Sequence, residues 1–325
     1  MCHAAGHSAP PGRGREKPPG RERSLPMTTS MKDQTIGYEH EMVFSRKHAA
    51  ELAADFFGTT ACHEGGTYDT YACLDQQGRK WKFQRDSSIE APTDIQRCEL
   101  VSPILRWADI ETLQELLRRL RAAGAKAHSS CGIHVHIGLG DHTPATLRNL
   151  VNLVNAHEDL LTYSLEISPE RRSRWCQEVD QDFLARLNRK KPKTSEELAR
   201  IWYDDTDWAY HAHTHYDSSR YHLLNLHAVW QKGTIEFRAF NSTMHAGEVK
   251  AYIQLCAAMS FQALSVRTAS PVRPVTDNPA YTFRCWLLRL GLIGEEFKTA
   301  RTHLLKHLPG NAAWRYGEAT ERHTA

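Results

Sequence analysis

The stretch CGIHVHIGLG, residues 131–140, alternates apolar and polar side chains and therefore predicts a β-strand. Strand side chains repeat every second residue, so three apolar side chains share one face while His134 and His136 share the other. A lone pair of this kind is explained well enough as polar residues on a solvated sheet face. A functional interpretation requires other strands that place matching side chains beside these two imidazoles.

The composition of the 325-residue chain is typical of a soluble globular protein, with 41% hydrophobic and 24% charged residues. The net charge of +3 comes from residues 1–30, and the rest of the chain is balanced, which argues against a nucleic-acid-binding body. No apolar stretch is long enough to span a bilayer, and the N-terminus lacks the apolar core of a signal peptide. The eight cysteines form no C-x-x-C pair, so we expect a reduced, cytoplasmic protein without a membrane segment.

Three regions are expected along the chain. Residues 1–30 are rich in proline, glycine and arginine and predict a disordered tail, because they cannot bury enough apolar surface to offset the cost of ordering. Residues 31–310 predict a single folded domain, and residues 311–325 a flexible C-terminal tail.

Within this domain the predicted strands come in hairpin-like runs, with helices between and after them. This order favours an α+β fold, with a mainly antiparallel, curved sheet and helices packed on one face. The other face can then remain open to solvent or to a ligand. We expect single strands at 37–43, 98–104 and 131–140, a hairpin over 67–89 that turns at 76–78, and a strand pair formed by 221–230 and 233–240. Helices are expected at 46–57, 109–123, 144–167, 180–189, 195–203 and over most of 246–307.

Other predicted strands also place two polar or charged side chains on one face, as the stretch 131–140 does. Glu39 and Glu41 share one face of the first strand, and Glu236 and Arg238 share one face of the last. If these strands belong to one sheet, its polar face carries Glu39, Glu41, Asp86, Glu99, His134, His136, Glu236 and Arg238.

Such a face has a definite chemistry. Neighbouring carboxylates repel one another, so they stay ionised only beside cations, or their pKa values rise. Hard oxygen ligands in this number suit Mg²⁺ or Mn²⁺, and an arginine beside such ions suits a phosphoryl group. The face therefore predicts nucleoside-triphosphate chemistry. The chain has neither G-x-x-x-x-G-K-[ST] nor G-x-G-x-x-G, so ATP would be held through metal ions and basic side chains.

Six motifs, in this order, resemble those of the amidoligase family, which belongs to the glutamine synthetase and glutamate–cysteine ligase superfamily of carboxylate–amine ligases. The resemblance extends from about residue 37 to about residue 250. Its motifs are GYEHE (37–41), DSSI (86–89), ELVSP (99–103), CGIHVH (131–136), RYHLLNL (220–226) and TIEFRAFNST (234–243).

The resemblance implies a glutamine-synthetase-like, ATP-dependent catalytic domain. ATP would phosphorylate a carboxylate of an amino-acid or peptide substrate, and an amine would then attack the acyl phosphate. Two or more Mg²⁺ or Mn²⁺ ions per site are implied. The implied metal ligands are Glu39, Glu41, Glu99, His134 and Glu236, with Asp86 assisting; His136 and Arg238 are directed at the ATP phosphates, and Arg220 and Asn225 lie near nucleotide or substrate.

Two features distinguish this chain within the resemblance. Asp86-Ser87-Ser88 stands where the family usually has D-G-S. Only the predicted tail precedes Glu39, so each chain should hold a complete site without a neighbour's domain.

Two further segments leave alternatives open. Residues 211–215, with His211, His213 and His215, predict either a second metal site or a flexible loop near the substrate. The basic run at 171–174 predicts either a contact with an acidic substrate or a solvated helix end.

Two rival functions remain. A mononuclear zinc or iron enzyme, a hydrolase or a cupin-like oxygenase, would use the H-x-H strand with a distant glutamate. A cupin-type site needs a glutamate soon after H-x-H, where this chain has residues 138–141, and one zinc ion leaves most of the carboxylates unexplained. A catalytically inactive binding module is the second rival, although every expected ligand position is filled. Neither the carboxylate nor the amine can be identified from these residues.

Overall fold

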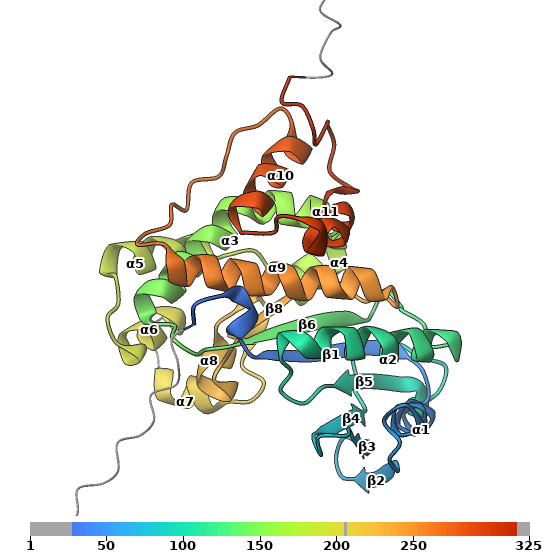
Figure 1. Ribbon diagram of the computed structural model, residues 1–325. Helices are drawn as coiled ribbons and strands as arrows, with labels where there is room; N and C mark the ends of the chain where they lie inside the picture. Colours follow the sequence, from blue (N-terminus) through green and yellow to red (C-terminus); the bar gives the residue numbers. More distant parts are fainter. Residues whose placement is uncertain (1–27, 205–206, 317–325) are drawn as a thin grey trace, which may run out of the picture.

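Eight strands form one antiparallel sheet in the order β2-β3-β4-β5-β1-β6-β8-β7 (Figure 1). The computed structural model describes residues 28–204 and 207–316. Together with the helices, the sheet confirms the predicted α+β class. The strands are β1 (Ile36–Val43), β2 (Cys62–Gly65), β3 (Thr70–Leu74), β4 (Lys80–Gln84), β5 (Arg97–Val101), β6 (Gly132–Gly138), β7 (Leu224–Asn225) and β8 (Thr234–Asn241).

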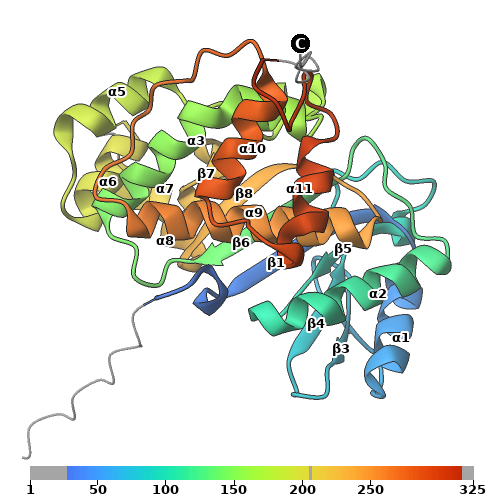
Figure 2. The ribbon, with the colours of Figure 1, turned by 45° about the horizontal axis from the view of Figure 1, so that its top comes forward.

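The helices α2 and α9 lie over one face of the sheet, and α3, α10 and α11 form a further layer beyond α9 (Figures 1 and 2). Helix α1 covers β3 and β4. Helices α5 to α8 cluster beside the β7 end of the sheet, whereas α4 lies near α11 (Figure 1). The bounds are α1 (Arg46–Phe57), α2 (Ile110–Ala122), α3 (Pro144–Ser164), α4 (Pro169–Arg174), α5 (Gln181–Lys190), α6 (Ser195–Trp202), α7 (Trp208–His213), α8 (His227–Lys232), α9 (Ala246–Ser265), α10 (Pro279–Arg289) and α11 (Lys298–Leu305).

Local signals explain where several helices begin and end. The Ser45 hydroxyl accepts a hydrogen bond from the His48 amide at the start of α1, and Gly58 ends the helix in the left-handed conformation, with φ of 67°. Thr143 caps α3, and Pro144 occupies its first turn, where its missing amide hydrogen costs nothing. These ends fall where the sequence predicted them.

The opening strand, β6, is buried on both faces. Ile133, Val135 and Ile137 pack toward the helical layer in the hydrophobic core, as predicted. His134 and His136 face the other side, and both are also buried. The polar face is covered along β6, because Arg171 of α4 packs against Gly132, and Lys232 reaches Glu39 beside the two histidines.

One predicted strand is wrong. Of residues 221–230, only Leu224 and Asn225 pair with β8, and the chain then turns into α8, which ends at Gly233 with φ of 63°. The buried residues Leu226 and Val229 are three apart, a spacing that suits a helix as well as an irregular strand. Of residues 211–215, for which a flexible loop was one expectation, residues 211–213 belong to the short helix α7.

The predicted tails fall mostly outside the described residues, at 1–27 and 317–325. Within the described part, the Thr28 amide donates to Asp141, and the Asn278 side chain donates to the carbonyls of Trp314 and Arg315. No helix among residues 28–204 and 207–316 combines the length and the apolar character needed to cross a membrane.

Candidate active site

The register of the central strands brings the predicted polar residues together. Glu39 of β1 lies opposite His134 of β6, and His136 lies opposite Glu236 of β8. Directly opposed residues in antiparallel strands have their side chains within contact distance. Strand pairing alone therefore gathers two glutamates and two histidines at the centre of the sheet.

Both imidazoles face the same two carboxylates. His134 Nδ1 lies 3.2 Å from Glu39 Oε2 and 3.7 Å from Glu236 Oε1. His136 Nε2 lies 3.3 Å from Glu39 Oε1 and 3.9 Å from Glu236 Oε1. The side chains thus form three overlapping groups of metal-ligand type, within each of which the ligand atoms lie within 4.8 Å of one another: Glu39–His136–Glu236, Glu39–Glu99–His134 and Glu41–Asp86–Glu99.

Two of the four glutamates in these groups are balanced by cations. Arg238 Nη1 donates to Glu236 Oε1 at 2.5 Å, and Lys232 Nζ donates to Glu39 Oε1 at 2.8 Å. Burial alone would raise the pKa of Glu236, but Arg238 and the histidines lower it below its usual value. Burial opposes ionisation of Glu39 in the same way, and His136 with Lys232 lower its pKa well below the ordinary range. Both carboxyls are therefore ionised at neutral pH.

The other two glutamates lack such cations. Burial raises the pKa of Glu41 to about 7, with a further increase from Asp86. Burial, followed by Glu39 and Asp86, raises the pKa of Glu99 well above its usual value. The Gly132 amide donates to Glu41 and Gln84 donates to Glu99. The two outcomes predicted for crowded carboxylates, pairing with cations and raised pKa values, thus occur side by side.

The donor set fits divalent cations. Burial, followed by Arg238, lowers the pKa of His134 to about 4, so this imidazole is neutral near pH 7 and can act as a ligand. His136 Nε2 is buried without a hydrogen-bond partner, between Glu39 and Glu236. Carboxylate oxygens with few imidazole nitrogens suit Mg²⁺ or Mn²⁺.

A cavity of about 550 Å³ lies over these groups. Arg220 lines this cavity. Its guanidinium carbon lies over the rings of Tyr216 and Tyr221, 5.6 and 5.8 Å from the ring centroids. Carboxylates, arginines and aromatic rings share the wall. It is lined by Glu39, Glu41, Asp86, Glu99, His134, Arg238 and Arg220 from the predicted set, and by Arg85, Arg171, Tyr68, Trp175, Tyr216 and Tyr221, with small polar residues between them.

Three predicted residues lie behind this wall. Glu236, His136 and Asn225 are buried beneath the cavity rather than on its surface. Asn225 Nδ2 donates to Glu236 Oε2 at 2.6 Å, while its Oδ1 accepts from the His227 amide. Asn225 therefore fixes the orientation of Glu236, and its expected place near nucleotide or substrate is not on the cavity wall.

Sequence reasoning missed Lys232 as a site residue. It stands between the two predicted strands, 221–230 and 233–240, in the position of a turn. In the structure it is the last residue of α8, and the left-handed Gly233 that follows leads directly into β8. The signal that could have revealed it is this helix-ending glycine, which brings the last helical residue back over the sheet. The two tyrosines Tyr68 and Tyr216, whose hydroxyls meet at 2.6 Å, were also missed.

The two segments left open by the sequence are now placed. His211 pairs with Asp217 at 2.6 Å and His215 packs on Tyr216, and within the described residues neither belongs to a group of metal-ligand type. In the basic run, Arg172 faces solvent and pairs with Glu178, but Arg171 is buried and lines the cavity. The basic run therefore does not act as one unit.

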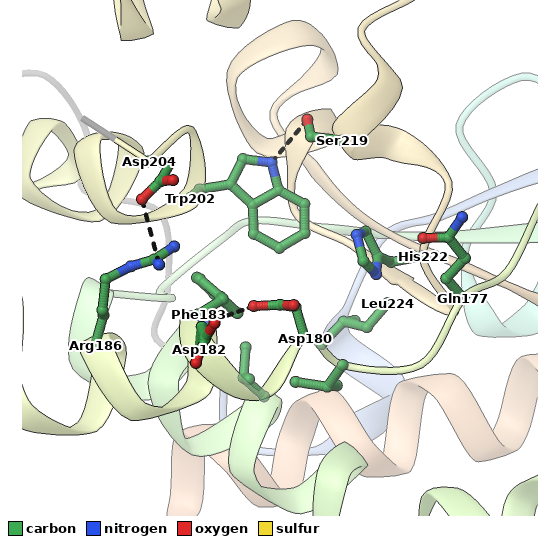
Figure 3. Close-up of a pocket in the computed structure, with 12 residues that line it drawn as sticks. Gln177, Asp180, Asp182, Phe183, Arg186, Trp202, Asp204, Ser219, His222 and Leu224 are labelled. Carbon is green, nitrogen blue, oxygen red and sulfur yellow. Dashed lines mark hydrogen bonds and ion pairs between the residues drawn. The ribbon is translucent and has the colours of Figure 1, made fainter. Parts of the chain in front are cut away.

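A second cavity of about 400 Å³ is separated from the first by the segment 219–222. Figure 3 shows the Trp202 indole nitrogen directed at Ser219 and Arg186 paired with Asp204. Ser219 and His222 line this cavity, whereas the intervening Arg220 and Tyr221 line the first. None of the predicted site residues, all of which the structure describes, lines this second cavity.

Comparison with known protein families gives a match over most of the chain. The sequence model of a family described as "putative amidoligase enzyme" matches residues 32–260. This span contains all eight strands, every residue of the three ligand groups and most of α9. No curated protein matches the chain.

Proposed function

Because the chain belongs to the amidoligase family, whose members form amide bonds, we propose that it is an ATP- and Mg²⁺- or Mn²⁺-dependent carboxylate–amine ligase. In this proposal ATP phosphorylates a substrate carboxylate and an amine displaces the phosphate from the acyl phosphate. The resemblance to the glutamine synthetase and glutamate–cysteine ligase superfamily supports the reaction and a related catalytic fold. The substrates would be a small or peptide-borne acid and an amine.

The observation that carries this proposal is the set of three overlapping ligand groups beneath a cavity walled by arginines. Glu39, Glu99 and His134 would hold one ion, and the flanking groups provide ligands for others. Ions held by these residues would supply positive charge that offsets the charge building up on the transferred phosphoryl group.

The protein's own cations have separate tasks in this proposal. Arg238 is held by Glu236 and by the Trp175 carbonyl, so its guanidinium is fixed at the edge of the ligand groups. Arg220 donates a long hydrogen bond to the His215 carbonyl and is supported by two tyrosine rings, which leaves it suited to grip a phosphate oxygen. Both side chains would orient the triphosphate rather than transfer protons.

The mononuclear zinc or iron alternative accounts for less of the site. One such ion takes three or four protein ligands, whereas the face presents five carboxylates and two imidazoles. An inactive binding module is less favoured, because every expected ligand position is filled and the ligand groups share one face of the sheet.

The proposal is tested by ADP release from ATP with panels of carboxylates and amines in Mg²⁺ or Mn²⁺. The purified chain should release ADP only when both substrates are present, and Glu236→Gln should abolish the release. Asp182→Asn, which changes a carboxylate of the second cavity, is the matched control and should remain active. Zinc or iron bound at one ion per chain, with no ADP release from any pair, would favour the mononuclear alternative.

A further inference from the structure

Arg171 of α4 is a buried arginine on the wall of the catalytic cavity, and it has few partners. Its side chain belongs to a residue that is only 4% exposed. Nη2 donates to the Arg238 carbonyl at 3.0 Å, and Nε is buried without any hydrogen-bond partner. Within the described part of the chain, no carboxylate forms an ion pair with it, although Glu41 is near enough to stabilise its charge.

The position of Arg171 is built into the fold. A Cβ atom at Gly132 would come within 2.5 Å of both terminal nitrogens of Arg171, so the guanidinium lies directly against the glycine backbone. The amide of the same Gly132 donates to Glu41 Oε2 at 2.6 Å. This glycine therefore seats a guanidinium beside the Glu41–Asp86–Glu99 group, and a larger residue there would displace it.

The neighbouring arginines of the basic run behave differently. Arg172 pairs with Glu178 at 2.5 Å and Arg174 approaches Glu170 at 3.8 Å, and both are solvent-exposed. A buried charge is costly unless it is paired and hydrogen-bonded. Of these three arginines, the one that is buried is the one without a carboxylate partner, and this one faces the cavity.

An anion from the cavity would supply the missing partner. A guanidinium presents two parallel N–H groups that match the two oxygens of a carboxylate. Both oxygens of a carboxylate gripped in this way accept N–H groups, which lowers their nucleophilicity and so opposes their phosphorylation. The carboxylate that reacts must therefore lie elsewhere, toward the metal-ligand groups.

We propose that Arg171 binds a second, non-reacting carboxylate of the acid substrate, so that the ligase takes a dicarboxylic acid, free or as an acidic residue of a peptide. This inference rests on the proposed function for the reacting end of the substrate. Beside Arg171, the rings of Trp175 and Tyr221 pack edge-to-face with centroids 5.3 Å apart and line the cavity. They provide an apolar wall for the carbon chain between the two carboxylates.

Binding without turnover tests the inference directly. Thermal stabilisation and calorimetric binding are measured for the full chain with Mg²⁺, using succinate, glutarate, adipate, butyrate and inorganic phosphate as probes. At least one dicarboxylate should bind more tightly than butyrate. Arg171→Met should weaken its binding by on the order of tenfold or more, and Arg171→Lys should restore part of the loss, because it keeps the charge but not the fork.

Arg172→Met is the matched control and should bind the dicarboxylate like the unmodified chain. The melting temperature of each variant without ligand is measured first, and if Arg171→Met does not fold, Arg171→Lys carries the test with a smaller expected loss. Equal binding by the variants and the unmodified chain overturns the inference, as does the absence of binding by all three dicarboxylates. Phosphate binding that depends on Arg171, without dicarboxylate binding, also overturns it and assigns Arg171 to the nucleotide.

The ADP-release assay distinguishes a failure of this inference from a failure of the proposed ligase function. If the chain releases ADP with dicarboxylates, Arg171→Met should reduce the preference for dicarboxylates over monocarboxylates by on the order of tenfold. ADP release with an unchanged preference refutes the role of Arg171 and leaves the ligase standing. Arg171-dependent dicarboxylate binding without ADP release under any condition refutes the ligase instead.

Discussion

Replacing Glu41 by glutamine should stabilise the metal-free protein, and the gain should depend on pH. Glu41 is 6% exposed, and burial outweighs the charges of Arg171 and Arg238, neither of which forms an ion pair with its carboxyl. The glutamine oxygen can still accept the hydrogen bond that the Gly132 amide donates to Glu41. The substitution therefore removes a buried charge while keeping the shape and one hydrogen bond.

The size of the effect follows from the pKa. In the folded protein the pKa of Glu41 is raised from 4.5 to about 7, so the folded state binds this proton more tightly than the unfolded chain. Stability is then lost as the pH rises from about 4.5 to about 7 and stays lost above it. Each pKa unit corresponds to about 1.4 kcal/mol, so the neutral glutamine should gain about 3 kcal/mol at pH 8 and about 1 kcal/mol or less at pH 5.

The assay is thermal unfolding of both proteins in EDTA at pH 5 and pH 8. With roughly 0.6 kcal/mol of stability per degree for a domain of this size, Tm should rise by about 5 °C at pH 8 and about 1 °C at pH 5. Glu115→Gln on the exposed side of α2 controls for the loss of one charge. A lower Tm at pH 8, or an equal gain at both pH values, would refute the electrostatic account of this site.

The remaining predictions concern the paired side of the ligand groups. Glu236→Gln should destabilise the metal-free protein by about 3 kcal/mol in urea unfolding, because it leaves Arg238 buried without its carboxylate; a gain in stability would contradict this. Lys232→Met should tighten Mn²⁺ binding in calorimetry at low salt, since the ammonium on Glu39 no longer competes, and unchanged affinity would place Lys232 outside the metal site. His134→Ala and His136→Ala should both raise the Mn²⁺ concentration needed for ATP-dependent stabilisation, since both rings face the same carboxylates. If His136→Ala instead weakens only ATP binding at saturating Mn²⁺, the result supports the contact with the ATP phosphates that the family resemblance implies.

The strand faces could be predicted from the sequence because a period of two leaves little freedom. Once β6 buries its apolar face, His134 and His136 must share the other, and the antiparallel register then places Glu39 and Glu236 beside them. The helix ends at Ser45 and Gly58 were equally readable, since capping depends on neighbours in the chain. The strand faces and the helix ends rest on local geometry and could therefore be predicted from the sequence, whereas the pairing of β6 with β1 and β8 joins distant segments and comes from the structure.

The environment of each side chain could not be predicted in this way. Residues 221–230 satisfy the apolar pattern of a strand, yet most of them form α8, and that helix is what delivers Lys232 to Glu39. The strand pattern also does not reveal that burial under the covered sheet lowers the pKa of His134 to about 4. Competition by protons at this ligand should therefore begin near pH 4, and any loss of metal affinity near pH 7 should come from Glu41 and Glu99 instead.

The division of charge across the sheet has a chemical consequence. Glu39 and Glu236 are ionised before any ligand arrives, because Lys232 and Arg238 already balance them. Glu41 and Glu99 hold their protons near neutral pH until a cation makes ionisation favourable. A metal ion that binds at Glu41 and Glu99 must displace protons. One that binds at Glu39 and Glu236 competes instead with Lys232 and Arg238. Metal binding should therefore release protons to the buffer, and comparing the binding heat in buffers of different ionisation enthalpy should show a release that Glu41→Gln reduces.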